Sequence, residues 1–185
     1  MTLFTEHSYD RVMVFIDYRN VYERIQMMEG HVKMDLFCLT QILVGSRDLI
    51  GAYVFDATRK YPHENDTSVQ VHNKLRENGF RVIAPESMVM RDGTVVQKET
   101  DVSLACEMLE HALLNHFDVA IVVSGDRDFV PAMKKVQAAG KRVEVAAFED
   151  TYNEECKRTA DVYYLLDDIP FLSMSSPVVQ KGVDY

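Results

Sequence analysis

The sequence predicts one α/β domain in which a central, mostly parallel sheet is flanked by helices, a three-layer arrangement. Short apolar runs alternate along the chain with segments of helical length, an order typical of a parallel sheet with crossover helices. The first run, residues 11–16, is almost continuously apolar, as expected of a strand covered on both faces. The chain has 185 residues, 47% hydrophobic and 26% charged, which fits one globular domain of ordinary size.

Caps and stop signals define the elements of the first half of the chain. Asp35 is a candidate N-cap, while Gly30, Gly79 and Pro85 end the elements before them. After the first strand, the expected elements are a helix over 20–28, a helix over 35–44, a strand over 49–55, a helix over 66–78 and a strand over 80–84.

The second half begins with a turn at residues 91–94 that suits a small hairpin. Thr100 is the expected N-cap of a helix that reaches residue 115. We assign the core face of this helix to apolar residues at helical spacing, namely Val102, Ala105, Leu109, Ala112 and Leu113. Then come a strand over 118–123, a helix to 139 with Pro131 in its first turns and a stop at Gly140, a strand over 142–147, a helix over 153–159 and a strand over 161–165.

The chain divides into an N-terminal extension (1–10), a domain over residues 11–168 and a C-terminal tail (169–185) that we expect to be flexible. No apolar run approaches the roughly 20 residues of a membrane span, and the polar N-terminus does not suit a signal peptide. A cytoplasmic location without membrane contact is therefore the expectation. The three cysteines lie far apart, which argues against a disulfide framework and a structural zinc site. Apolar edge strands are compatible with a homodimer.

Aspartates gather at the expected carboxyl ends of two strands. Asp17 directly follows the first apolar strand, and Asp126 and Asp128 follow a later one after a Ser124-Gly125 turn. Asp101 lies at the start of a helix. Because the strands of a parallel sheet end at the same edge, we expect Asp17, Asp126 and Asp128 to meet there and Asp101 to join them.

Several carboxylates brought together repel one another unless a cation lies between them. Oxygen ligands without a nearby His or Cys suit Mg²⁺ or Mn²⁺. Such ions position a water molecule, lower its pKa and stabilise the charge of a phosphate, so the site suits hydrolysis of a phosphodiester. Each aspartate also has an ordinary explanation, because Asp17 and Asp128 could cap helices and Asp101 could be a first-turn acid.

The net charge of −9 counts against a broad, non-specific grip on nucleic acid. It counts less if the acids cluster at a metal site, where bound cations reverse the local field. Lys98 lies three residues before Asp101, and Arg59-Lys60 occupies the loop after the second strand. Both are candidate phosphate contacts, of which Lys98 is the better one, because a solvated loop is the better explanation of Arg59-Lys60.

Three motifs in the sequence resemble the NYN domain of the PIN-like nuclease superfamily, most closely its LabA-like subgroup. They are Asp17-Tyr-Arg-Asn20, Lys98-Glu-Thr-Asp101 and Ser124-Gly-Asp-Arg-Asp-Phe129, of which the last is the most specific. The resemblance covers about residues 12–166. It implies a Rossmann-like, PIN-like fold and a metal-dependent, endonucleolytic ribonuclease that acts on single-stranded or structured RNA.

The resemblance also implies roles for individual residues. Asp17, Asp101, Asp126 and Asp128 match the catalytic and metal-binding acids of the family, with Mg²⁺ or Mn²⁺ as the cofactor. Asn20 and Ser124 match residues that orient carboxylates, water or phosphate. Glu107 matches a further acidic position, but it lies on a different face of its helix from Asp101, so we rank it lower.

The sequence departs from the family pattern at Tyr18 and Arg19, and at Glu99 and Thr100. These departures put the choice of substrate in doubt more than metal binding. Arg19 is a candidate phosphate contact and Tyr18 a candidate stacking platform for a base, although Tyr18 could equally pack inward and Arg19 could be solvated.

Two other classes of function compete with the nuclease. One is a regulatory or RNA-binding module of the same fold with little or no catalysis, which would bind no metal or bind it without cleaving RNA. The other is a small-molecule phosphatase that uses Asp126 and Asp128 as an Asp-x-Asp motif. In such enzymes the nucleophilic Asp follows the first strand, whereas this pair comes late in the chain.

Overall fold

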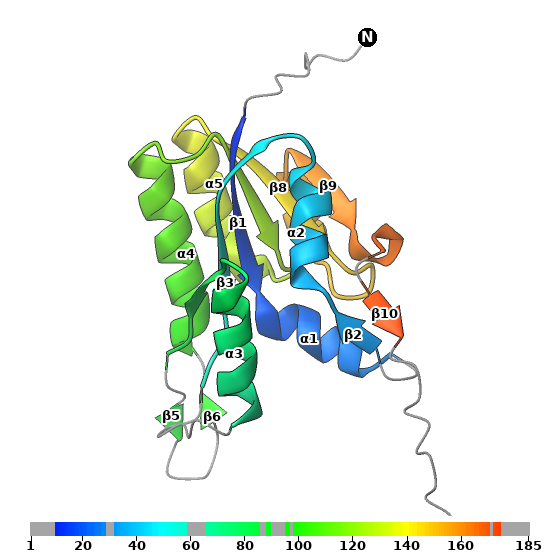
Figure 1. The fold of residues 1–185 in the computed structure, drawn as a ribbon. Coiled ribbons are helices and arrows are strands. Elements are labelled where there is room, and N and C mark those ends of the chain that lie inside the picture. Colours follow the sequence, from blue (N-terminus) through cyan, green and yellow to red (C-terminus); the bar gives the residue numbers. More distant parts are fainter. Residues whose placement is uncertain are drawn as a thin grey trace, which may run out of the picture.

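Six parallel strands form the central sheet of the computed structural model, which describes residues 10–28, 32–58, 66–85, 88–89, 95–96, 98–170 and 172–174. The strand order is β4-β3-β1-β7-β8-β9 (Figure 1). The strands are β1 (Arg11–Asp17), β3 (Asp48–Phe55), β4 (Arg81–Ile83), β7 (Val119–Val123), β8 (Arg142–Ala147) and β9 (Val162–Leu165). The chain leaves β1 toward β3 on one side and later returns to β7 on the other, so the strand order reverses between β1 and β7. Such a reversal opens a crevice at the carboxyl ends of the strands.

Helices cover both faces of this sheet and complete the predicted three layers (Figure 1). One face carries α1 (Tyr18–Gln26), α2 (Leu36–Val44) and α3 (Thr67–Glu77), and the other carries α4 (Lys98–Leu113), α5 (Val130–Ala138) and α6 (Glu154–Thr159). Two short 3-10 turns, η1 (Arg127–Phe129) and η2 (Leu166–Asp168), complete the helical elements of the described residues. The side chains of β1 alternate between the two cores: Val14 packs toward α1 and α2, and Phe15 packs toward α4 and α5. Burial on both faces explains why this strand reads as a continuous apolar run.

Two pairs of very short strands lie outside the main sheet. β5 (Met88–Val89) pairs antiparallel with β6 (Val95–Val96), which confirms the predicted hairpin, although its turn at residues 91–94 lies outside the described residues. β2 (Val32–Met34) pairs antiparallel with β10 (Leu172–Met174), a pairing that the sequence did not predict. The tail that we expected to be flexible thus contributes a strand. Strands of three residues are too short for a periodic pattern, and their partner lies far away in the sequence.

Helix α4 differs from the prediction in its start and in its buried face. It begins at Lys98, so Thr100 lies inside its first turn and is not the N-cap. Of the predicted face, Ala112 is buried and Ala105 and Leu109 pack partly buried against the core. Val102 and Leu113 are instead 61% and 75% exposed, and Leu104 and Met108 are buried. The helix carries two apolar stripes, and its contacts with β1, β3 and α5 decide which of them is buried.

The caps that delimit other helices agree with the sequence. Asp35 caps α2 by accepting a hydrogen bond from the Cys38 backbone N–H at 2.9 Å. Gly79 and Gly140 follow α3 and α5 in the left-handed region, with φ of 89° and 81°, and so permit the chain to leave the helix. The predicted stop at Gly30 lies outside the described residues. Within the described part of the chain, none of the helices combines the length and the apolar character that crossing a membrane would require.

Candidate functional site

The carboxyl ends of β1 and β7 bring together the first two parts of the site. The strands are neighbours in register, with Ile16 opposite Val123. Asp17 is the last residue of β1 and the N-cap of α1, and Ser124 is the first residue after β7. The strand-edge rule therefore places Asp17 beside the Ser124-Gly125-Asp126 turn, as the sequence predicted.

A chain of hydrogen bonds fixes the Asp17 carboxylate. Its Oδ2 accepts from the Ser124 hydroxyl at 3.0 Å, and its Oδ1 accepts from the Asn20 backbone N–H at 3.2 Å. The Asn20 side-chain oxygen in turn accepts from the Gly125 backbone N–H at 3.3 Å, and the Ser124 hydroxyl accepts from the Asp126 backbone N–H at 3.2 Å. Asn20 and Ser124 thus orient Asp17 and hold the 124–126 turn against the start of α1.

A cleft of about 340 Å³ opens at this edge of the sheet. Three of its five acidic side chains were named from the sequence, namely Asp17 on β1, Asp101 on α4 and Asp126 before η1. The complete lining is Asp17, Arg19, Asn20, Glu23, Asp56, Ala57, Thr100, Asp101 and Asp126. Residues that are up to 109 positions apart in the chain therefore share one acidic hollow.

Burial and mutual repulsion disfavour the ionised carboxylates in this cleft. Burial is the main reason that the pKa of Asp17 rises to about 6; the charges of Asp101 and Asp126 raise it further, against the opposing hydrogen bonds from Asn20 and Ser124. The pKa of Asp101 is also raised, first by desolvation and then by the charges of Asp126 and Asp128, while Arg19 lowers it. A cation bound between these groups would relieve the repulsion.

Other residues named from the sequence lie around this cleft or away from it. Asp128 is exposed and is not part of the cleft lining, although its charge reaches Asp101 and its backbone N–H donates to Asp126 Oδ1 at 2.9 Å. Arg19 lies at the rim and pairs with Glu23. Lys98 is the first residue of α4, and the position of its side chain is not among those described.

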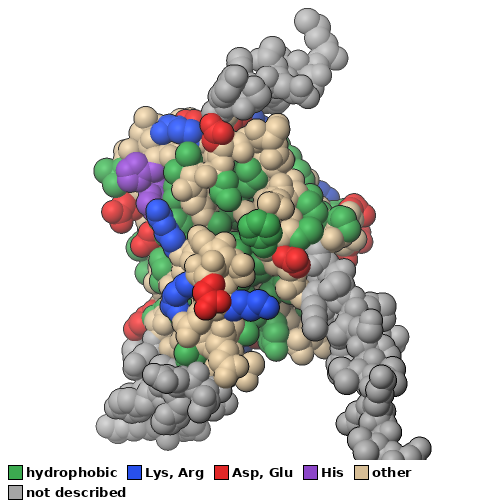
Figure 2. Space-filling view, in the orientation of Figure 1, with side chains coloured by type: hydrophobic (Ala, Val, Ile, Leu, Met, Phe, Trp, Pro, Cys, Tyr) green, Lys and Arg blue, Asp and Glu red, His purple; other side chains and the backbone are tan. Residues whose placement is uncertain are grey.

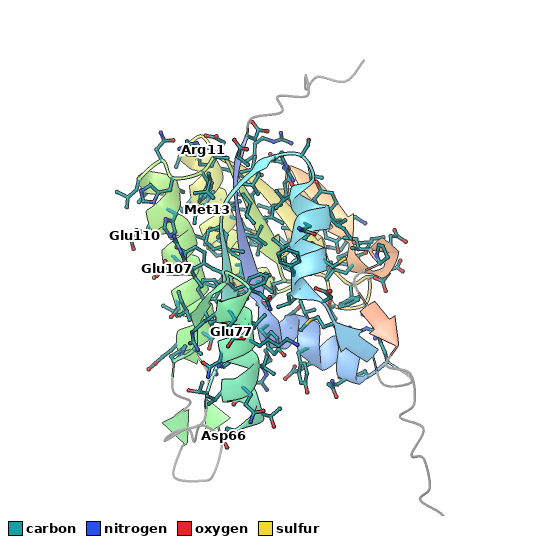
Figure 3. The ribbon with its side chains drawn as sticks, in the orientation of Figure 1. Arg11, Met13, Asp66, Glu77, Glu107 and Glu110 are labelled. Carbon is teal, nitrogen blue, oxygen red and sulfur yellow. The ribbon has the colours of Figure 1, made fainter. Side chains whose placement is uncertain are left out.

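Glu107 faces away from the cleft. It lies midway along α4 (Figure 3) and its carboxylate is 3.5 Å from His111 Nε2, one helical turn further on. The two candidate phosphate contacts Arg59 and Lys60 lie outside the described residues. Glu107 is therefore a suitable control residue for experiments on the cleft.

The sequence analysis missed Asp56 as a site residue. Asp56 follows β3 directly, just as Asp17 ends β1, and it lines the cleft. Its carboxylate accepts from or donates to His72 Nε2 at 2.7 Å, according to the protonation of the pair, and His72 is only 2% exposed. The position of Asp56 after an apolar strand was a usable signal, whereas no sequence pattern links it to His72 on α3.

The donor set of the cleft fits a hard divalent cation. Its side-chain ligands are carboxylate, amide and hydroxyl oxygens, which suit Mg²⁺ or Mn²⁺. The Thr100 hydroxyl is buried at this edge, and no described residue forms a hydrogen bond with it. Among the described residues, no three His, Cys, Asp or Glu side chains already converge at ligating distance. Cation binding would therefore require the carboxylates to move closer together.

Gly125 is the one position in the turn where a side chain cannot fit. A Cβ atom there would lie 2.3 Å from the Thr151 backbone oxygen and 2.7 Å from Tyr152 Cα. Gly125→Ala is expected to lower the free energy of unfolding by at least about 2 kcal/mol, because backbone atoms cannot move aside as a side chain can. Thermal or urea unfolding measures this change.

Gly51→Ala in β3 is the matched control for that substitution. Its added Cβ would meet Met13 Cε at 3.4 Å and Tyr53 Cε2 at 3.5 Å, which are ordinary contacts. The free energy of unfolding of this variant is expected to lie within about 0.5 kcal/mol of that of the native protein. Equal stability of the two variants would show that the turn does not need a glycine.

The fold and the cleft together define a three-layer α/β protein with an acidic site at the carboxyl edge of a parallel sheet. The chain belongs to the NYN domain family, whose model matches residues 11–167. This match confirms the family resemblance drawn from the three motifs. NYN domains are generally nucleases of the PIN-like type.

Among solved structures, the chain is similar to a protein of unknown function from Vibrio parahaemolyticus RIMD 2210633. The two share 22% sequence identity with a TM-score of 0.73, over 92% of this chain and 100% of the other. At this identity the likeness establishes the shared fold. No curated protein matches the sequence.

Proposed function

We propose that the protein is a metal-dependent ribonuclease that hydrolyses RNA phosphodiester bonds endonucleolytically at the acidic cleft. The observation that carries the proposal is the convergence of Asp17, Asp101 and Asp126, from three separate elements, on one cleft at the reversal of strand order. Membership of a family of nuclease-like domains supports the same activity. Within that family we assign the chain to the LabA-like subgroup, on the Ser124–Phe129 motif.

Each residue of the cleft has a role in this proposal. Asp17, Asp101 and Asp126 would hold Mg²⁺ or Mn²⁺, which when bound supplies a Lewis acid beside the phosphate and lowers the pKa of water. Asn20 and Ser124 keep the Asp17 carboxylate in a fixed orientation through the hydrogen bonds described above. The three carboxylates come from a strand end, a helix and a short turn, so packed elements hold their backbone positions and the side chains make the approach to the cation.

Charge at the rim governs how RNA would approach. The guanidinium of Arg19 lies at the edge of the cleft and lowers the pKa of Asp101, so its field reaches the carboxylates. Among the described residues that line the cleft, Arg19 is the basic one and hence the candidate phosphate contact; Lys98 remains a prediction, and Asp128 contributes charge outside the lining. With a net charge of −9, the protein is expected to bind RNA weakly and to lose affinity as the salt concentration rises.

The proposal is tested by incubating the purified protein with a labelled single-stranded RNA and Mn²⁺, Mg²⁺ or a chelator. Cleavage is expected with the metals and not with the chelator. Asp126→Asn is expected to cleave about 10- to 100-fold more slowly, because it removes one of the three charges that would attract the cation. Glu107→Gln, a substitution of an acid on α4 outside the cleft, is expected to cleave like the native protein.

A regulatory RNA-binding module of the same fold is the second candidate. The observation that favours it is that the carboxylates among the described residues do not already form a three-ligand site. If folded protein binds RNA but cleaves none of several RNAs with either metal, the nuclease proposal is wrong and the binding module is correct. Equal cleavage by the native protein and Asp126→Asn would remove Asp126 from the mechanism.

A further inference from the structure

A second and larger hollow, of about 600 Å³, lies between α1, α2 and α3 on one face of the sheet. We call it the tyrosine groove. Its apolar lining includes Tyr18, Tyr22, Ile25, Leu36, Phe37 and Leu75. Its volume falls in the range of sites that bind small ligands. On the face that carries α2 and α3, hydrophobic side chains reach the surface and basic side chains lie beside them (Figure 2).

The tyrosine groove adjoins the acidic cleft. Tyr18 follows Asp17 directly and lines the groove, and burial, followed by the charge of Asp56, raises its pKa to about 12. Asp56 lines the acidic cleft, so a charge of the cleft acts on a side chain in the wall of the groove. Helix α3 connects them as well, because His72 contacts Asp56 while Lys74, two residues later in the same helix, lines the groove.

The groove presents aromatic rings to solvent. Tyr18 and Tyr22 stack, with ring centroids 5.5 Å apart and an angle of 14° between the rings. Tyr22 is 43% exposed and Phe37, at the start of α2, is 51% exposed. Rings that are held by packing on one side and exposed on the other are suited to stack on a flat aromatic ligand.

The polar groups of the groove differ from those of the acidic cleft. Lys74, Asn78 and Gln26 offer N–H donors, and the lining contains one acid, Asp35. The Asp35 carboxylate already caps α2. Lys74 and Asp35 balance in charge, so the groove is close to neutral beside a strongly acidic cleft. Such a site suits an uncharged ring system that carries hydrogen-bond acceptors and is joined to a phosphate.

We propose that the tyrosine groove binds an unpaired nucleobase of single-stranded RNA next to the phosphate that the acidic cleft holds. This inference rests on the proposed function and assigns its substrate class. The base stacks on Tyr22 and Phe37, and Lys74 contacts the adjoining backbone. A base in a duplex is already stacked and paired, so the groove selects single strands.

The test compares the binding of native protein and Tyr22→Ala to a short fluorescent RNA by anisotropy, in the presence of a chelator so that no cleavage occurs. Tyr22→Ala is expected to bind about 5- to 100-fold more weakly, the range typical of losing one stacked base. Tyr22→Phe keeps the ring and is expected to stay within about twofold of the native protein. Leu113→Ala, which truncates an exposed side chain at the far end of α4, is the control and is expected to bind normally.

Two further measurements make the result specific to bases. An abasic oligonucleotide of the same length is expected to bind native protein and Tyr22→Ala equally weakly. An RNA containing 4-thiouridine is expected to crosslink to peptides of α1 or α2. Phe37→Ala, on a different helix, is expected to show the same loss of RNA affinity. It tests the proposal if Tyr22→Ala does not fold.

The outcomes separate this inference from the nuclease proposal. If folded Tyr22→Ala and Phe37→Ala both bind RNA like the native protein, the proposal that the groove binds a base is wrong, even if metal-dependent cleavage is present. If both variants bind RNA more weakly and the native protein cleaves no RNA, the base-binding proposal is supported and the ribonuclease proposal is wrong. A native protein that binds no single-stranded RNA in chelator, or that binds duplex and abasic strands as well as it binds single strands, also overturns the groove.

Discussion

Asp17→Asn is expected to slow RNA cleavage by about 100- to 1,000-fold while making the metal-free protein more stable at neutral pH. The loss of activity follows because Asp17 is the most buried carboxylate of the cleft, 8% exposed, and the one that both Asn20 and Ser124 orient. The gain in stability follows because an uncharged amide avoids the free-energy cost of burying a charge. Cleavage assays and urea unfolding at pH 7.5 measure the two effects.

The stability effect has a defined pH dependence. Because the folded-state pKa of Asp17 is raised from 3.8 to about 6, its stabilising contribution is present below about pH 4 and is lost as the pH rises through 6. The native protein should therefore lose up to about 3 kcal/mol relative to Asp17→Asn between pH 4 and pH 7. If the free energy of unfolding changes with pH in the same way for both proteins, Asp17 is not the group that causes the pH dependence.

Divalent cations should reverse this dependence. They bind the ionised carboxylate, so Mn²⁺ is expected to raise the melting temperature of the native protein more at pH 7.5 than at pH 5.5. For the Asp17→Asn variant, Mn²⁺ should raise the melting temperature less at both pH values. An equal rise in melting temperature for the variant would show that the cation binds away from Asp17.

Arg47→Ala is expected to lower the free energy of unfolding by about 3 kcal/mol. Its guanidinium forms two hydrogen bonds, at 2.7 and 3.0 Å, to Glu144 on β8, and Glu144 is 1% exposed. The same guanidinium also donates to the Leu43 and Val44 carbonyls at the end of α2. Removal of Arg47 leaves a buried carboxylate with Tyr164 and a more distant Arg142 as its partners.

Urea unfolding of two further variants separates the buried charge from the rest of the effect. Arg47→Met combined with Glu144→Leu should recover most of the loss, because neither charge then remains in the core. Arg158→Ala removes an exposed ion pair with Glu154, whose side chains are 79% and 62% exposed, and should change stability by less than about 0.5 kcal/mol. If Arg47→Ala behaves like Arg158→Ala, the Arg47–Glu144 pair does not stabilise the fold.

The sequence predicted the elements of the main sheet well because those elements carry strong local signals. The strand over residues 142–147 and the N-cap at Asp35 agree with the structure at the residue level. The buried face of α4 was predicted in part, because two apolar stripes compete on one helix and tertiary contacts choose between them. Ala112, Ala105 and Leu109 do contact the core, whereas Val102 and Leu113 are exposed. The β2–β10 pair was missed because three-residue strands have no period to detect.

The candidate site was predictable where it follows from strand ends and not where it depends on packing. Asp17 and Asp126 meet because parallel neighbours end at one edge, a rule that needs no coordinates. Asp56 obeys the same rule and was overlooked. The tyrosine groove has no comparable signal, since it draws Tyr22, Phe37 and Lys74 from three helices whose mutual placement is set by the whole core.

Helix α1 begins at a residue that the cleft also uses, and this has a thermodynamic consequence. The Asp17 carboxylate that would hold a cation also accepts the backbone N–H of Asn20 in the first turn of the helix, a cap worth about 1 kcal/mol. Cation affinity and the order of the first helical turn are therefore linked, and each must change the other by the same factor. Substitutions along α1 that alter only helix propensity should then shift the cation dissociation constant, although they touch no ligand.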